Sequence, residues 1–176
     1  MKANQQISVI IPMYNAENTV MKALDSVRLQ KGDFVFEIII VNDGSTDASR
    51  NVVENYRKQN PQMNIILLDQ PNSGVSKARN AAMEVSGGEY IALLDSDDEW
   101  LPNKLEVQIK LINDNPELDF LGGPFNETCL KIFTKKIDSL YNAKVSDICI
   151  KNFPQPSTVI FKKSIFVVKS VVISPL

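Results

Sequence analysis

The segment Tyr90–Trp100 holds the residues of this sequence with the clearest capacity for chemistry. Five apolar or small residues, Tyr90–Leu94, predict a short buried strand, and the carboxylates of Asp95, Asp97 and Asp98 follow it at once. Burying unpaired carboxylates is very costly. We therefore expect the acids at the carboxyl end of that strand, where open α/β sheets bind their ligands.

A hard divalent cation is the natural counter-charge for such a cluster, because carboxylate oxygens suit Mg²⁺ or Mn²⁺. Such ions commonly bridge to the phosphates of a substrate. The sequence contains no histidine, which excludes catalytic triads and metal sites that rely on imidazole. The alternative is an acidic turn that only caps the helix expected after Trp100, with Asp98 as the capping residue.

The segments around the acidic stretch must build a sheet that positions it. Apolar runs predict strands at Ile7–Pro12, Phe36–Val41, Ile65–Leu68, Tyr90–Leu94, Phe120–Phe125 and Ser157–Phe161. Helical periodicity predicts helices at Glu17–Leu29, Ala48–Gln59, Val75–Val85 and from Pro102 to about Asn113. This alternation predicts an α/β fold with a mostly parallel sheet, right-handed crossovers and helices on both faces.

Polar residues follow each of the first strands: Tyr14 and Asn15, then Asp43, Asn72, and finally Asp95 with Asp97. The carboxyl ends of parallel strands lie along one edge of a sheet. Loops that are far apart in the sequence are therefore expected to converge on one crevice.

The composition is that of an ordinary globular protein, with 176 residues, 44% hydrophobic and 23% charged. The net charge of −2 gives no electrostatic reason to expect nucleic acid. Cys129 and Cys149 are expected to be free thiols in a reducing compartment. No apolar run approaches the ~18 residues of a membrane span, and the polar N-terminus does not resemble a signal peptide. We expect a cytoplasmic protein, with peripheral association at the inner face of the membrane left open.

Together these segments resemble the family-2 inverting glycosyltransferases over Ile7–Phe161. The motifs that carry the resemblance are Ile10–Asn15, Ile40–Asp47, Asn72–Asn80 and Leu94–Asp98, the last with an Asp-x-Asp (DXD) pattern. The resemblance implies the GT-A fold, a Rossmann-like α/β/α sandwich with a mostly parallel, mixed central sheet. It also implies transfer of a sugar from a nucleotide-diphosphate sugar, expected to be a UDP-sugar, to a saccharide or another hydroxyl acceptor. The synthesis of polysaccharides or cell-surface glycans is the expected setting.

The resemblance assigns the base of the donor to the first two motifs. Pro12 and Tyr14 would line the base pocket, with Tyr14 able to stack on the ring. Asp43 would accept a hydrogen bond from the imide N–H of a uracil-like base, which suits a carboxylate because it only accepts when ionised. Asp43 could instead cap the following helix, as Asp47 is expected to do, and Tyr14 could be ordinary core packing.

The resemblance assigns the diphosphate and the metal to the other two motifs. Asn72 and Arg79 would contact the base or the diphosphate, since arginine offers fixed, charge-assisted donors to anions. Asp95 would face the ribose or the metal, and Asp97 would ligate Mn²⁺ or Mg²⁺. The ion would stabilise the departing nucleoside diphosphate. Arg79 could also be a solvated helix residue.

The sequence departs from the family pattern in its last part. An inverting transferase needs a general base to deprotonate the acceptor hydroxyl. Family members supply an aspartate after a segment like Gln155–Phe161, whereas here no Asp or Glu follows Asp147. The acids after Glu117 are Asp119, Glu127, Asp138 and Asp147, and none matches the family's acidic motif, so the general base is unassigned.

We therefore expect residues 1–125 to form a nucleotide-sugar-binding GT-A core. Residues 126–176 would form a partial acceptor-side region with a divergent, apolar tail, as after a truncation or a reading-frame change near Phe166. One alternative is a non-catalytic module that binds nucleotide and metal. Another is a nucleotidyltransferase, against which the lack of a glycine-rich phosphate loop after Ile11 argues.

Overall fold

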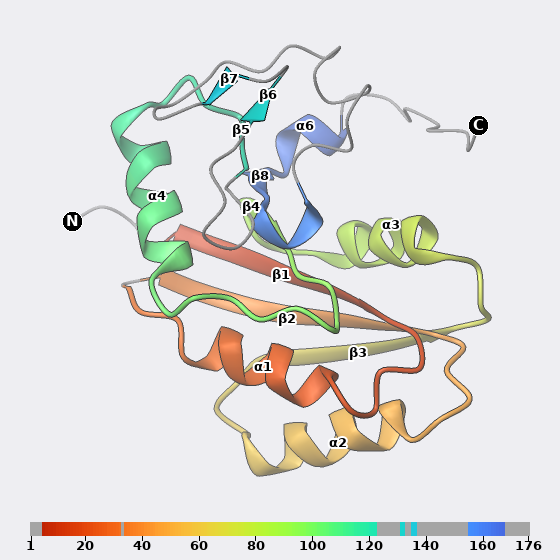
Figure 1. The fold of residues 1–176 in the computed structure, drawn as a ribbon. Coiled ribbons are helices and arrows are strands. Elements are labelled where there is room, and N and C mark those ends of the chain that lie inside the picture. Colours follow the sequence, from red (N-terminus) through yellow and green to blue (C-terminus); the bar gives the residue numbers. More distant parts are fainter. Residues whose placement is uncertain (1–4, 33, 123–130, 133–134, 137–154, 168–176) are drawn as a thin grey trace.

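The computed structural model describes residues 5–32, 34–122, 131–132, 135–136 and 155–167. Its main sheet has the strand order β3-β2-β1-β4-β8-β5 (Figure 1). The strands of this sheet are β1 (Gln5–Met13), β2 (Phe34–Asp43), β3 (Ile65–Gln70), β4 (Tyr90–Leu93), β5 (Phe120–Leu121) and β8 (Ile160–Lys162). The main helices are α1 (Val20–Arg28), α2 (Ser49–Gln59), α3 (Val75–Val85) and α4 (Lys104–Asp114). The smaller elements are β6 (Lys131–Ile132), β7 (Lys135–Lys136), the 3₁₀ turn η1 (Pro156–Thr158) and α6 (Ser164–Val167).

The sheet is mostly parallel and mixed, as the sequence predicted. Strand β1 runs parallel to β2 and β4, and β2 runs parallel to β3. Strand β8 is antiparallel to both of its neighbours, β4 and β5. The carboxyl ends of the four parallel strands therefore lie at one edge of the sheet, as a ligand crevice requires.

The core lies on both faces of β1, which explains its nearly continuous apolar sequence. Ile7, Val9 and Ile11 are buried on the face covered by α1, α2 and α4. Ile10 is buried on the opposite face, which α3 covers with Ala78 among its inward residues. Figure 1 shows α1 and α2 on one side of the sheet and α3 on the other. Each fully buried aliphatic side chain of this kind contributes about 1.5–3 kcal/mol to folding.

Helix α1 begins at Val20, later than the predicted Glu17, because the preceding residues bond to the β2–α2 loop instead. The amide of Glu17 donates to Asp47 Oδ2 at 3.1 Å, and the Glu17 carboxylate accepts from the amide of Ala48 at 2.8 Å. A backbone held by a neighbouring loop in this way gains its hydrogen bonds outside a helix.

Strand β1 continues one residue beyond Pro12, which the sequence predicted as its end. The pairing of β1 with β4 stops at Ile10, opposite Leu93, whereas pairing with β2 continues to Met13. Pro12 is tolerated because it lies beyond the last residue of β1 that pairs with β4.

The predicted strand Ser157–Phe161 divides into η1 and β8, with Pro156 at the first position of the 3₁₀ turn. The predicted strand Phe120–Phe125 is shorter in the structure, because β5 ends at Leu121 and Gly122 follows it outside the strand. Residues 123–125 of that prediction fall outside the described residues, as do Cys129 and Cys149. In the described part of the chain, every helix is too short or too polar to traverse a bilayer.

Candidate functional site

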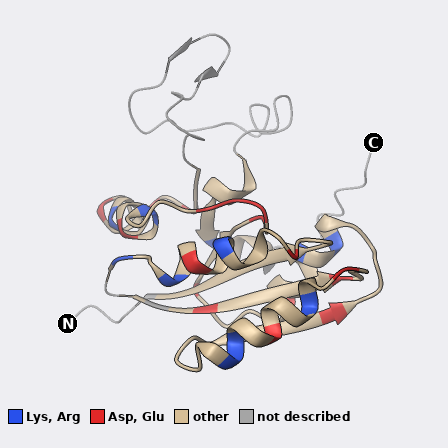
Figure 2. Ribbon diagram, turned by 60° about the horizontal axis from the view of Figure 1, so that its bottom comes forward, with Lys and Arg blue, Asp and Glu red and all other residues tan. Residues whose placement is uncertain are grey.

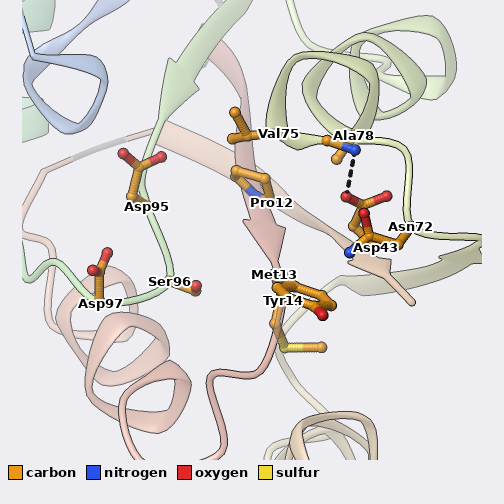
Figure 3. Close-up of a pocket in the computed structure, with 11 residues that line it drawn as sticks. Pro12, Met13, Tyr14, Asp43, Asn72, Val75, Ala78, Asp95, Ser96 and Asp97 are labelled. Carbon is orange, nitrogen blue, oxygen red and sulfur yellow. Dashed lines mark hydrogen bonds between the residues drawn. The ribbon is translucent and has the colours of Figure 1, made fainter. Parts of the chain in front are cut away.

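A cleft of about 420 Å³ opens at the carboxyl ends of the parallel strands (Figure 3). This volume is in the range of small-molecule sites. The lining residues are Pro12, Met13, Tyr14, Asp43, Asn72, Gly74, Val75, Ala78, Asp95, Ser96 and Asp97. Six residues predicted from the sequence are among them, namely Pro12, Tyr14, Asp43, Asn72, Asp95 and Asp97. The loops after four strands thus meet, as expected for a parallel sheet.

Asp43 lies at the end of β2 and is only 4% exposed. Its Oδ1 accepts hydrogen bonds from Gln70 Nε2 at 2.7 Å and from the amide of Ser73 at 2.8 Å. Its Oδ2 accepts from the amide of Gly74 at 2.8 Å, the dashed bond in Figure 3. Asp43 therefore holds the loop before α3 and does not cap the helix that follows it.

These bonds determine the charge state of Asp43. Burial raises the pKa of its carboxyl, but the hydrogen bonds from Gln70, Ser73 and Gly74 outweigh burial and hold the pKa below its usual value of 3.8. The group is therefore an ionised, acceptor-only side chain at neutral pH. Each carboxylate oxygen has room for about two donors. Oδ1 already has its two, so Oδ2 offers the remaining acceptor position.

The apolar wall of the cleft comes from β1 and α3. Pro12 is buried, and Val75 and Ala78 at the start of α3 lie across from it. The side chain of Tyr14 is 52% exposed, which contradicts ordinary core packing. A half-exposed aromatic ring at the mouth of a cleft is suited to stack on a planar ligand.

The loop that carries Tyr14 is tied to the β2–α2 loop. Asn15 adopts φ 48°, and its amide donates to Ser45 Oγ at 3.0 Å while its Oδ1 accepts from the amide of Thr46 at 2.8 Å. Asp47 accepts from the amide of Ser49, the first residue of α2, at 3.0 Å, but Ala48, not the predicted Asp47, occupies the N-cap position of that helix. These contacts hold the Tyr14 and Asp43 loops in one arrangement.

The acidic edge of the cleft contains one neutralised and one free carboxylate. Arg79 Nη2 donates to Asp95 Oδ1 at 2.5 Å, so Arg79 is an ion-pair partner and not a solvated helix residue. Arg79 Nε is buried without a hydrogen-bond partner in the described structure. Asp97 is exposed and has no side-chain partner among the described residues. The acidic loop is visible as an extended red stretch of the ribbon in Figure 2.

The predicted role of Asp98 as a helix cap is wrong. Helix α4 begins later, at Lys104 with Asn103 before it, and Asp98 Oδ2 instead accepts from Ser157 Oγ at 2.5 Å. The loop between Trp100 and α4 separates the acids from the helix, so their side chains cannot reach its first turn.

The acids at this edge of the cleft could hold a divalent cation whose remaining ligands come from a bound substrate and water. No cluster of three or more acidic, cysteine or histidine side chains placed to hold an ion occurs in the parts of the chain that the structure describes. Mg²⁺ and similar ions usually take one or two carboxylates together with substrate phosphates and water. Asp97 and the free Oδ2 of Asp95 match that pattern.

Besides the lining residues Met13, Gly74, Val75, Ala78 and Ser96, two residues that hold the acids of the site were not predicted from the sequence. Gln70, the last residue of β3, orients Asp43, and Ser157 in η1 binds the acidic loop. Both act through other side chains across 27 to 62 residues of sequence. The only sequence signal was that Gln70 directly precedes the predicted ligand-binding turn.

The acids that line the cleft are Asp43, Asp95 and Asp97, and each already has a predicted role, so the lining residues offer no further carboxylate as a general base. Asp119 forms an ion pair with Lys162 at 2.9 Å, beside β8. Glu127, Asp138 and Asp147 lie outside the described residues.

Residues 8–161 match the profile of the family described as "Glycosyl transferase family 2". TuaG of Bacillus subtilis (strain 168), a teichuronic acid biosynthesis glycosyltransferase by its name, is 41% identical over 106 residues, which are 60% of this chain and 41% of TuaG.

Solved structures of S. aureus TarS 1-349 share the fold. The complex with UDP is 28% identical with a TM-score of 0.69, covering 92% of this chain and 48% of that chain. The complex with UDP-GlcNAc is 27% identical with a TM-score of 0.70, covering 92% and 46%. This chain thus spans less than half the length of these relatives.

Proposed function

Because the chain belongs to glycosyl transferase family 2, we propose that it carries the donor site of a glycosyltransferase that uses a UDP-sugar. The observation that carries this proposal is Asp43, a buried, ionised carboxylate with one open acceptor position in the cleft. The complexes of TarS with UDP and UDP-GlcNAc support a uridine donor.

In this proposal the base lies between the apolar wall and Asp43. Tyr14 stacks on the ring, Pro12 and Val75 fill the space behind it, and Asp43 Oδ2 accepts the imide N–H. Asn72, which is exposed at the rim, contacts the base or the diphosphate.

The sugar diphosphate lies towards Asp95 and Asp97. Asp97 and Oδ2 of Asp95 would hold Mn²⁺ or Mg²⁺, and Arg79, which is not among the residues that line the cleft, would act by orienting Asp95 through their ion pair. A bound cation would supply positive charge for the departing diphosphate. The free Asp97 carboxylate would otherwise repel that anion, so the site's own charges make donor binding depend on the ion.

The division into a donor-binding part at 1–125 and an acceptor-side part at 126–176 is part of the proposal. The second part contributes β8 to the sheet of the first. A saccharide acceptor, a role in polysaccharide synthesis and a cytoplasmic location remain predictions from the sequence.

A second candidate is a module that binds donor and metal without transfer. The observation in its favour is that residues 148–176, all those after Asp147, include no Asp or Glu. Both candidates share the donor site, and they differ only in turnover.

Calorimetric titration of UDP with Mn²⁺ or with EDTA tests the shared donor site. We expect Mn²⁺ to strengthen UDP binding to the wild type and Asp97→Ala to remove that gain without lowering the melting temperature of the free protein. Asp114→Ala is the matched control, since it removes an exposed carboxylate at the end of α4, where Asp114 pairs with Lys110. Equal UDP affinity of the wild type in Mn²⁺ and in EDTA would show the metal assignment to be wrong.

A further inference from the structure

The acidic loop after β4 is shaped by a serine that lies 62 residues further along the chain. Ser157 Oγ accepts a hydrogen bond from the amide of Asp95 at 2.9 Å and donates one to Asp98 Oδ2 at 2.5 Å. One hydroxyl thus joins the two ends of the segment that contains Asp97. The segment has its own bond as well, from the amide of Asp98 to the carbonyl of Asp95 at 3.1 Å.

Ser157 can hold this loop because the core holds Ser157. Its side chain is buried, at 6% exposure, and its carbonyl accepts from Trp100 Nε1 at 2.7 Å. The next carbonyl, of Thr158, accepts from Gln108 Nε2 of α4 at 2.8 Å. The carbonyl of Val159 accepts from the amide of Leu93 in β4 at 3.2 Å. The hydroxyl is therefore fixed relative to both the sheet and α4.

The charges of the loop show why such a contact matters. Asp95, Asp97, Asp98 and Glu99 place four carboxylates within five residues, and their mutual repulsion favours a spread loop. Arg79 neutralises Asp95, and Ser157 gives a hydrogen bond to Asp98. The two acids that flank Asp97 are thereby held, and the carboxylate of Asp97 is left exposed without a partner among the described residues.

We infer that Ser157 is a positioning residue of the donor site, which holds the acidic loop so that Asp97 faces the cation and the diphosphate. This inference rests on the proposed function. Ser157 touches neither ligand and acts only through Asp95 and Asp98. A hydroxyl is required at this position, because the group must donate to one partner and accept from the other.

Ser157→Ala tests the inference with two independent readouts. Hydrogen exchange of the Asp95 amide in the ligand-free protein should become faster by about tenfold or more, because the amide loses its acceptor. The gain in UDP affinity that Mn²⁺ gives should fall by about 10- to 100-fold, the range for groups that orient metal ligands. UDP affinity in EDTA should be unchanged, because Asp43 and Tyr14 are untouched.

Ser26→Ala is the matched control. Ser26 is equally buried, at 6% exposure, but its hydroxyl donates to the carbonyl of Ala23 within α1 at 2.7 Å. It should change neither readout. Asp98→Asn keeps the shape of the loop and weakens the same contact, so it should lower the Mn²⁺-dependent gain in the same direction. The double variant with Ser157→Ala should be no worse than Ser157→Ala alone, since Ser157→Ala already removes the contact that Asp98→Asn weakens.

The outcomes separate the inference from the proposed function. If Mn²⁺ does not strengthen UDP binding to the wild type, the proposed metal role fails, and with it the functional part of the inference. If the wild type shows the gain and Ser157→Ala keeps it, only the inference is overturned. An equal loss of affinity in Mn²⁺ and in EDTA also overturns it, because general damage to the fold would produce that result.

Discussion

At the scale of single residues, two acids of the proposed site, Asp43 and Asp95, already have hydrogen-bond or ion-pair partners within the protein. Asp43 gives three of its acceptor positions to the protein and keeps one for a ligand. Asp95 gives one oxygen to Arg79, whereas Asp97 gives none to any described residue. In the proposed site, these hydrogen-bond partners leave Asp43 one position for a ligand donor and leave Asp95 and Asp97 oxygens for a cation.

Replacing Asp43 by asparagine should invert the preference for the base. The bonds from Gln70 and the amide of Ser73 require an oxygen at the Oδ1 position, so the new amide group would take the Oδ2 position. There it would lose the hydrogen bond from the amide of Gly74 and present a donor to the base. Uracil presents an N–H there and cytosine an acceptor. The wild type should bind UDP about tenfold or more tightly than CDP, since an unpaired buried polar group costs roughly 1–3 kcal/mol. Asp43→Asn should favour CDP, and Asp43→Ala should bind both alike.

Titration of both nucleotides at several pH values measures this preference. Because the pKa of Asp43 lies below 3.8 in the folded protein, the wild-type preference should stay constant from pH 8 to pH 5. The ionised form favours folding above the unfolded-state pKa, and that contribution is lost only as the pH falls through the lower, folded-state pKa. Equal affinities of the wild type for UDP and CDP would remove the case for a uridine donor.

At the scale of elements, tight turns bring the strand ends close enough to share one cleft. Gly44 follows β2 with φ +72°, and a Cβ at this position would lie 2.6 Å from the backbone nitrogen of Asn72. The β2–α2 loop and the loop before α3 therefore meet through backbone contact. Asp43, directly before this glycine, binds the same neighbouring loop.

Gly44→Ala should separate these loops. The left-handed backbone and the contact with Asn72 together should lower the free energy of unfolding by about 1–3 kcal/mol, and UDP affinity should fall as well. Gly87→Ala is the control, because its Cβ would meet only Glu37 Oε1 at an ordinary 3.5 Å. Chemical denaturation and UDP titration of both variants measure the two effects. Wild-type behaviour of Gly44→Ala would show that the two loops can move apart without loss of the site.

At the scale of the whole molecule, the residues of the proposed donor site lie within a chain that spans less than half of TuaG or of the TarS chain. Strand β8 is the last strand of the sheet in sequence order, and the turn before it places Ser157 beside the acidic loop. The acidic loop of the proposed donor site is therefore bonded to a segment that follows β4 by more than 60 residues.

We expect this polypeptide by itself to transfer sugar poorly or not at all. Losing a general base typically costs a factor of about 10²–10⁴ in rate. Asp119 is paired with Lys162 rather than placed in the cleft. A radiolabelled UDP-sugar assay with a panel of saccharide acceptors measures turnover, with UDP binding as the control for folding. Robust turnover that Asp119→Asn abolishes would identify Asp119 as the base.

The sequence by itself determined the alternation of strands and helices, the parallel sheet and the convergence of its polar loops on one cleft. These features follow from local hydrophobic patterns and from the rule that parallel strands end at one edge. The proposed roles of Asp43 and Asp97 came instead from the resemblance of their motifs to the glycosyltransferase family. The helix start at Val20 could not be read locally, because Asp47 competes for the backbone of the preceding turn.

Only the tertiary structure decided which polar groups satisfy one another. It pairs Arg79 with Asp95, gives Asp43 to Gln70 and directs Asp98 to Ser157 instead of a helix end. Hydrogen bonds of this kind have no sequence periodicity, because they join loops that are adjacent only after the sheet has formed. The physical reason is that a carboxylate near the core takes whichever donor the folded chain places beside it.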